Sequence, residues 1–193
     1  STLTLTYDKV GYSDDELRQI AKTNPVTLNV EETLYAATLF DDLGDKLAIY
    51  KNAERLFAND WRGVNNAGYI LYLQNDLDGA MTQFEKANGL NSNSTTTNNI
   101  GAVTHMKGDN AKAMELFNEA GSANETNYNK GLIQIAEGTY AEAISNMGGY
   151  NTFNMALAKV VSGDAEGGLS ALEASGDDSA VAYYLKAIIG ART

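Results

Sequence analysis

Four asparagines recur along this chain of 193 residues in a pattern that could form a binding surface. Asn66, Asn99, Asn129 and Asn154 each stand two residues before a glycine or an alanine. An asparagine side chain offers hydrogen-bond donors and an acceptor, so a row of amides could grip the backbone of an extended peptide. The same row could instead be a structural ladder that hydrogen-bonds neighbouring helices. The sequence leaves both interpretations open.

Residue types that support catalysis or metal binding are sparse. His105 is the only histidine, so there is no second imidazole for a metal site or a proton relay, and we interpret it as a polar residue on a groove. The absence of cysteine excludes a disulfide framework and a zinc–thiolate site. No Ser-His-Asp set, phosphate-binding glycine loop or HExxH motif occurs. The sequence therefore predicts a protein without catalytic residues, cofactor or metal, with an enzyme as the rival class.

The charge of the chain narrows the range of partners. Fourteen basic residues against 25 acidic ones give a formal net charge of −11. Such a charge disfavours nucleic acid and anionic membranes as partners. No segment approaches the roughly 20 consecutive apolar residues that span a bilayer. We expect no nucleic-acid partner and no direct membrane insertion by this segment.

A fixed period organises the middle of the chain. Four small or aromatic residues recur at an offset of 33 positions. They are Gly68, Ala80, Phe84 and Ala87 in the first copy and Gly101, Ala113, Phe117 and Ala120 in the second. A period in this range is typical of stacked structural repeats. Each copy predicts two helices that approach closely at the small residues, with the phenylalanine filling the remaining space.

Turn signals separate the two helices of each copy. Asn75 suits the left-handed residue that ends a helix, and Asp76 suits the N-cap of the next helix. The second copy has Gly108 and Asp109 at the same places. Gly138 marks a corresponding turn later in the chain.

The pattern Val64-x2-Ala67-Gly68-x2-Leu71, followed by Ala80-x3-Phe84, resembles the tetratricopeptide repeat. The tryptophan and the terminal proline of that family are missing from both copies, and Thr97 and Thr104 replace bulky residues. The resemblance implies an all-α fold, a right-handed superhelical array of antiparallel helix pairs. It also implies that the first helix of each pair lines the concave side, and that the protein binds proteins or peptides without catalysis.

We expect a single repeat domain over residues 1–193. Its predicted parts are an extended leader at 1–12, degenerate N-terminal helices at 13–58, the best repeats at 59–91 and 92–123, degenerate repeats at 124–176, and a last helix at 177–193 that looks cut. Within the second part, helices are predicted at 31–42 and 45–58 around a turn at 43–45. Gly190 is predicted to be a turn residue, and Met147 and Leu172 are predicted to replace the phenylalanine in the degenerate repeats.

The predicted binding face lies on the first helices. It comprises Arg62, Asn65, Asn66, Tyr69, Tyr72, Asn98, Asn99, His105 and Tyr128. One cation among amides and aromatic rings suits a neutral or mixed polar ligand, such as an extended peptide or a cell-wall fragment.

Two alternatives to this face remain. If Tyr69 and Tyr72 pack against a neighbouring repeat, no groove is open and the chain is an architectural spacer or assembly module. Some relatives of this type bind C-terminal carboxylates through asparagines and cations on successive first helices. Arg62, Asn66 and Asn99 match half of that clamp, but Glu125 stands where it requires a cation.

Composition also carries an expectation about location. The richness in Asn, Thr, Gly and Tyr, the lack of cysteine and the low pI are typical of an exported bacterial protein. Residues 182–190 resemble helical-repeat segments of Gram-negative outer-membrane proteins that also carry an OmpA-like domain. The resemblance implies a scaffold in the periplasm or associated with the outer membrane. Because the chain opens on serine, we expect it to be part of a longer protein.

Overall fold

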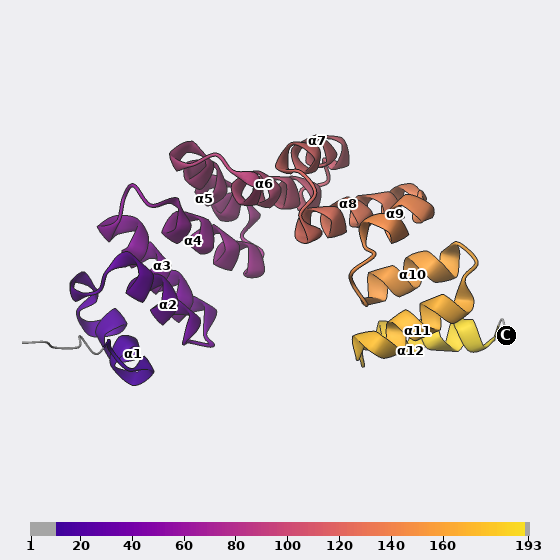
Figure 1. Ribbon diagram of the computed structural model, residues 1–193, viewed down its shortest axis with the longest axis horizontal. Coiled ribbons are helices and arrows are strands. Elements are labelled where there is room, and N and C mark those ends of the chain that lie inside the picture. The colour runs from indigo at the N-terminus through magenta and orange to yellow at the C-terminus, as the bar shows by residue number, and fades with distance from the viewer. Residues whose placement is uncertain (1–10, 192–193) are drawn as a thin grey trace, which may run out of the picture. The chain divides into compact units, whose positions relative to one another are not determined.

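The computed structural model describes residues 11–191, and within this range every regular element is a helix (Figure 1). The helices are α1 (Asp14–Thr23), η1 (Pro25–Thr27), α2 (Val30–Thr38), α3 (Leu43–Leu56), α4 (Trp61–Leu73), α5 (Leu77–Leu90), α6 (Ser94–Met106), α7 (Asn110–Ala120), α8 (Asn124–Glu137), α9 (Tyr140–Asn146), α10 (Phe153–Val161), α11 (Ala165–Ser175) and α12 (Ala180–Gly190). The predicted all-α class is confirmed. Most of the predicted leader lies outside the described residues. None of the described helices is long and apolar enough to cross a bilayer.

The chain divides into two compact units between Ser92 and Asn93. The first unit contains α1 to α5, and the second contains α6 to α12. Within each unit, helices that follow one another in sequence pack together as antiparallel pairs, most extensively α4 with α5, α6 with α7, and α10 with α11. The division lies one residue after the border predicted between residues 91 and 92. Each unit has its own apolar core.

The close approach of paired helices depends on a glycine facing a large side chain. A Cβ atom added to Gly68 would lie 2.9 Å from the ring of Phe84, and one added to Gly101 would lie 2.7 Å from Phe117. Both rings are almost completely buried. Because carbon atoms normally stay about 3.5–4.0 Å apart, neither ring leaves room for a methyl group. The roles predicted for these glycines and phenylalanines are confirmed.

The degenerate repeats keep this arrangement with other side chains. Met147 lies over Gly131, where an added Cβ would be 2.7 Å from its Cγ atom. Met147 and Leu172 are both fully buried, as predicted for substitutes of the phenylalanine. An unbranched methionine adapts to irregular space, which explains how the pair α8–α9 keeps its packing although α9 is short.

The turns within the repeats follow the predicted chemistry. Asn75 has φ of 61° and Gly108 has φ of 94°, so both occupy the region that most side chains avoid. The carboxylates of Asp76 and Asp109 then accept backbone N–H groups in the first turns of α5 and α7. These bonds satisfy donors that a helix start leaves without partners.

Two predicted boundaries were wrong. The turn before α3 lies at residues 39–42 and not at 43–45, because the Asp42 carboxylate accepts the N–H of Asp45 and starts the helix earlier. Gly44 therefore lies inside the first turn of α3. Gly190 is the last residue of α12, and Ala191 follows it in a right-handed conformation, so Gly190 is not a turn residue.

Candidate functional site

A polar pocket of about 350 Å³ lies in the second unit, where the N-terminal turns of α6 and α8 come together. Its lining is made mostly of hydroxyl and amide side chains. The residues are Ser94, Thr95, Asn98 and Asn99 from α6, with Ala123, Glu125 and Thr126 at the start of α8. The Asn93 side chain begins α6 by accepting the N–H groups of Thr95 and Thr96 at 2.9 and 3.1 Å. This cap places the first two turns of α6 along the pocket.

A hydrogen bond between the side-chain amides of two helices holds one of the residues that line this pocket. The Nδ2 of Asn129 on α8 donates to Oδ1 of Asn98 on α6 at 3.1 Å, and Nδ2 of Asn98 donates to Oδ1 of Asn99 at 3.4 Å. The structure thus forms a rung of the predicted ladder at Asn129. The same bonds hold Asn98 and Asn99 in defined orientations in the wall of the pocket. The structural and binding interpretations of the asparagine row are therefore compatible here.

Tyr128 and Asn154 form a second link between first helices. The Nδ2 of Asn154 on α10 donates to the Tyr128 hydroxyl at 3.0 Å, and that hydroxyl lies 3.5 Å from Oγ1 of Thr152. The ring of Tyr128 also contacts Tyr150, with centroids 4.9 Å apart. Tyr128 is half-buried, so its phenol joins α8 to α10 and only part of its surface faces solvent.

His105 lies at the other end of α6. Its Nδ1 is 2.7 Å from Oδ1 of Asn110, the first residue of α7. This contact links the end of α6 to the start of α7. Ten residues of helix, about 15 Å along the axis, separate His105 from Thr95, so it is not part of the polar pocket.

The remaining predicted residues belong to α4 in the first unit. Asn65 is buried, with 6% of its surface exposed, and its Nδ2 donates to Oδ1 of Asn66 at 3.3 Å. The Asn66 side chain forms a hydrogen bond with the hydroxyl of Tyr50. Burial raises the pKa of Tyr50, and the bond to Asn66 acts in the opposite direction. Tyr69 is 51% exposed, whereas Tyr72 is half-buried and its pKa is raised by burial.

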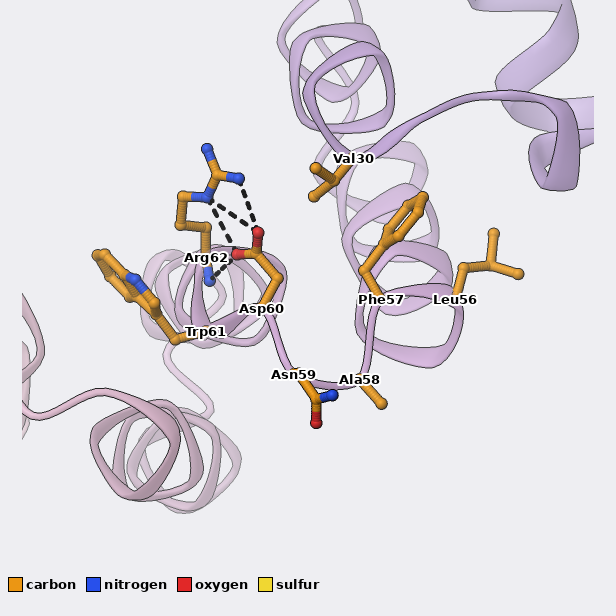
Figure 2. A pocket seen from close by; sticks show the side chains of 8 residues that line it. All are labelled: Val30, Leu56, Phe57, Ala58, Asn59, Asp60, Trp61 and Arg62. Atoms are coloured by element: carbon orange, nitrogen blue, oxygen red, sulfur yellow. Dashed lines mark hydrogen bonds and ion pairs between the residues drawn. The ribbon is translucent and has the colours of Figure 1, made fainter.

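Arg62, at the start of α4, contacts two carboxylates, those of Glu31 and of Asp60; Figure 2 shows its bonds to Asp60. Its Nη2 lies 2.7 Å from Oδ2 of Asp60, and its Nη1 lies 2.8 Å from Oε1 of Glu31. Hydrogen bonds from the Arg62 side chain hold the pKa of Asp60 below its usual value. The bonds to Asp60 and Glu31 raise the pKa of Arg62. Two carboxylates of its own chain therefore compensate the charge of the guanidinium.

The structure brings Asn98 and Asn99 together in the polar pocket, and places the α4 residues in the other unit. Ser94, Thr95 and Thr126 were missed by the sequence reasoning. Their sequence signal is weak: Thr95 and Thr126 stand one helical turn before Asn99 and Asn129, but no serine or threonine stands one turn before Asn66 or Asn154. Among residues 11–191 no group of three or more His, Asp or Glu side chains is arranged to hold a metal ion.

Solved structures of other proteins share this arrangement of helices. No protein-family model matches the sequence. One chain in the crystal structure of the APC/C hetero-tetramer Cut9-Hcn1 aligns with a TM-score of 0.76 and 16% identity. The alignment covers 89% of this chain and 38% of the other. YrrB, described as a TPR protein with an unusual peptide-binding site, aligns at 0.55 over 90% of this chain and 99% of that one, at 18% identity. This is the tetratricopeptide-repeat fold.

One curated protein is also similar at the level of sequence. The BBSome complex member BBS4 of Bos taurus is 27% identical over 112 residues, which cover 56% of this chain and 22% of that protein. The aligned part is thus about a fifth of BBS4. Both best repeats lack the tryptophan and the terminal proline of the tetratricopeptide repeat. The likeness of this chain to proteins with that fold therefore rests on helix packing, which the glycine and phenylalanine pairs maintain.

Proposed function

We propose that this chain is a non-catalytic scaffold that binds protein or peptide segments, and that the polar pocket between α6 and α8 is a contact site. The observation that supports this most is the lining of the pocket by hydroxyls and amides from two first helices. An extended peptide presents N–H and C=O groups that need partners when they leave water. Side chains that can both donate and accept are suited to such a backbone.

The charge around the pocket indicates the kind of peptide. Glu125 is the one ionisable residue in the pocket lining, and it is exposed. The chain as a whole has a net charge of −11. A neutral segment, or one with a lysine or arginine opposite Glu125, fits this surface better than an acidic segment. YrrB is described as peptide-binding, and the fold in common with this chain is compatible with the same class of ligand.

The clamp for C-terminal carboxylates fits the geometry poorly. Glu125 would repel a carboxylate in the polar pocket, and Arg62 is occupied by Asp60 and Glu31. The spacer alternative is favoured by a different observation. Asn129 and Asn154 each donate a side-chain N–H to a residue of the neighbouring first helix, as expected for a purely structural ladder.

We also propose that the scaffold acts in the bacterial cell envelope, as part of a longer protein that carries an OmpA-like domain. The composition and the resemblance of residues 182–190 support this setting. A cell-wall fragment, with its amides and sugars, is then a second ligand class for the polar pocket. Fractionation of the source cells tests the location: recovery of the protein from the cytosolic fraction alone would overturn it.

The binding role can be tested on an array of unrelated blocked peptides. The site variant is Ser94→Ala, Thr95→Val and Glu125→Gln combined, which changes the rim of the pocket and leaves the Asn98–Asn129 bond intact. The control is Asn118→Ala, which removes an exposed amide from α7. Both variants must keep the helical circular dichroism of the parent. We expect the parent and the control to bind the same peptides and the site variant to lose them; equal binding by all three would overturn the proposal.

A further inference from the structure

A second pocket, of about 510 Å³, lies in the first unit at the turn between α3 and α4. Figure 2 shows its side chains: Val30 from the first turn of α2, Phe57 and Leu56 at the end of α3, and Asp60, Trp61 and Arg62 at the start of α4. The exposed loop residues Ala58 and Asn59 complete it. None of these residues belongs to the pocket between α6 and α8.

The walls of this pocket are apolar and incompletely covered. Val30, Leu56, Phe57 and Trp61 are all only half-buried, although they are among the residues that proteins usually bury. Ligand pockets of a few hundred Å³ are commonly lined by such side chains with a few polar groups at the edge. The pocket is therefore suited to an apolar side chain from outside the unit.

The charged side chains at and beside this pocket have a net negative charge. Glu31 and Asp60 together face one cation, Arg62. Arg62 directs Nε and Nη2 to Asp60 and Nη1 to Glu31, so its charge is already balanced by two carboxylates. The Glu31 side chain remains 71% exposed. A cation on the ligand would complete the charge balance at Glu31.

We propose that this pocket binds an apolar side chain of a peptide that carries a lysine or arginine next to it, with the cation against Glu31. The inference adds a second anchor to the proposed peptide-binding function, on which it rests. Its recognition chemistry differs from that of the polar pocket: burial of one apolar side chain supplies the attraction, and the charge selects among peptides.

Trp61 makes the inference directly testable, because it is the only tryptophan of the chain and lines this pocket. The probes are three blocked pentapeptides: Gly-Ser-Leu-Lys-Gly, the same peptide with Glu in place of Lys, and the same peptide with Ala in place of Leu. Each is titrated into the unmodified chain while Trp61 emission is recorded. We expect a saturable change with the Leu-Lys peptide, at least about tenfold weaker binding when Leu becomes Ala, and weaker binding when Lys becomes Glu.

A matched pair of variants tests the role of Glu31. Glu31→Gln should weaken the Leu-Lys peptide about two- to fivefold, the effect of an exposed ion pair, and should narrow its advantage over the Leu-Glu peptide. Glu85→Gln, at an exposed position of α5, should change neither. The inference is overturned if Trp61 emission does not respond, if the three peptides bind equally, or if the two variants behave alike.

The experiments distinguish the proposal for this pocket from the proposal for the polar pocket. A silent Trp61 together with array binding that depends on Thr95 and Glu125 would remove only the second anchor. A selective Trp61 response together with array binding that ignores the site variant would remove only the polar pocket.

Discussion

A glycine beneath one large side chain joins the two helices of each well-formed repeat. Phe84 covers Gly68, Phe117 covers Gly101, and the methionine of the pair α8–α9 does the same over its glycine. The free energy of this contact comes from burying the ring and from the close packing that a missing Cβ allows. The contact needs both the glycine and the large side chain. This pair of residues therefore recurs in repeats that lack the tryptophan and the proline of the tetratricopeptide repeat.

Replacing either ring should destabilise the protein strongly. We expect Phe84→Ala and Phe117→Ala each to lower the free energy of unfolding by about 3–5 kcal/mol, because each leaves a cavity between two helices. Tyr184→Ala is the control, since that ring is 70% exposed, and it should change stability by no more than about 0.5 kcal/mol. Urea denaturation followed by circular dichroism measures all three. Unchanged midpoints for the phenylalanine variants would show that the rings are not core.

The ion pair at Asp60 predicts a pH dependence with a definite sign. Hydrogen bonds from Arg62 lower the pKa of Asp60 from its usual 3.8. A carboxyl group with a lowered pKa in the folded state stabilises that state above its unfolded pKa, and this contribution disappears as the pH falls through the folded pKa. Asp60→Asn should therefore be less stable than the parent at pH 6, and the difference should shrink below about pH 4.

Asparagine is a suitable replacement because it is also a good N-cap, so the variant removes mainly the charge. The measurement is the urea midpoint of both proteins between pH 6 and pH 2.5. A difference that stays constant over this range would mean that Asp60 acts only as a helix cap.

At the scale of the element, the turn between two paired helices depends on backbone conformation more than on contacts. An added Cβ at Gly108 would meet no atom within 4 Å, yet its φ is 94°. Asn75 occupies the equivalent turn of the preceding repeat with φ of 61°. The two copies thus meet one conformational requirement with the residue types that tolerate it best.

Substitutions at this turn should rank by conformational preference. We expect Gly108→Ala to lower the free energy of unfolding by about 1–2 kcal/mol, and Gly108→Asn to have a smaller effect. Gly89→Ala, inside α5 and equally free of steric contact, should stabilise by about 0.5–1 kcal/mol, because alanine favours a helix over glycine. Urea midpoints give the ranking. Equal effects of alanine at positions 108 and 89 would contradict the conformational argument.

The whole chain consists of two units, each with its own core. In repeat proteins stability is close to a sum of the stabilities of single repeats and of nearest-neighbour terms. A single free energy of unfolding then describes the chain only if both units unfold together. The position of Trp61 in the first unit allows this to be measured, because tryptophan emission reports one unit and circular dichroism reports the helices of both.

Phe117→Ala provides the corresponding test. It removes a core ring of the second unit, so the circular dichroism transition should move to lower urea concentration and broaden. The transition of Trp61 emission should move less. Phe84→Ala, in the first unit, is the matched variant and should move the Trp61 transition clearly. Coincident shifts of both signals in both variants would show that the whole chain unfolds as one cooperative unit.

Local chemistry made much of the fold predictable from the sequence. The period of the small and aromatic residues determined the pairing of helices, because a close approach needs a glycine and a filled space at one helical register. The turns and caps followed from Asn75, Asp76, Gly108 and Asp109, whose preferences act within a few residues. The misplaced turn before α3 shows the limit of such signals, since Asp42 and Asp45 were both able to begin the helix.

Part of the candidate sites depended on the tertiary structure alone. The sequence placed Asn98 and Asn99 on a polar face, but only the packing of α6 against α8 decided that Asn129 reaches Asn98 and that Ser94, Thr95 and Thr126 join them around a pocket. Arg62 was predicted as a ligand-binding cation, and Glu31, 31 positions away, decided its surroundings. The physical reason is range: propensities and caps act along the chain, whereas an ion pair or a pocket wall depends on which distant residues the helix packing brings within a few ångströms.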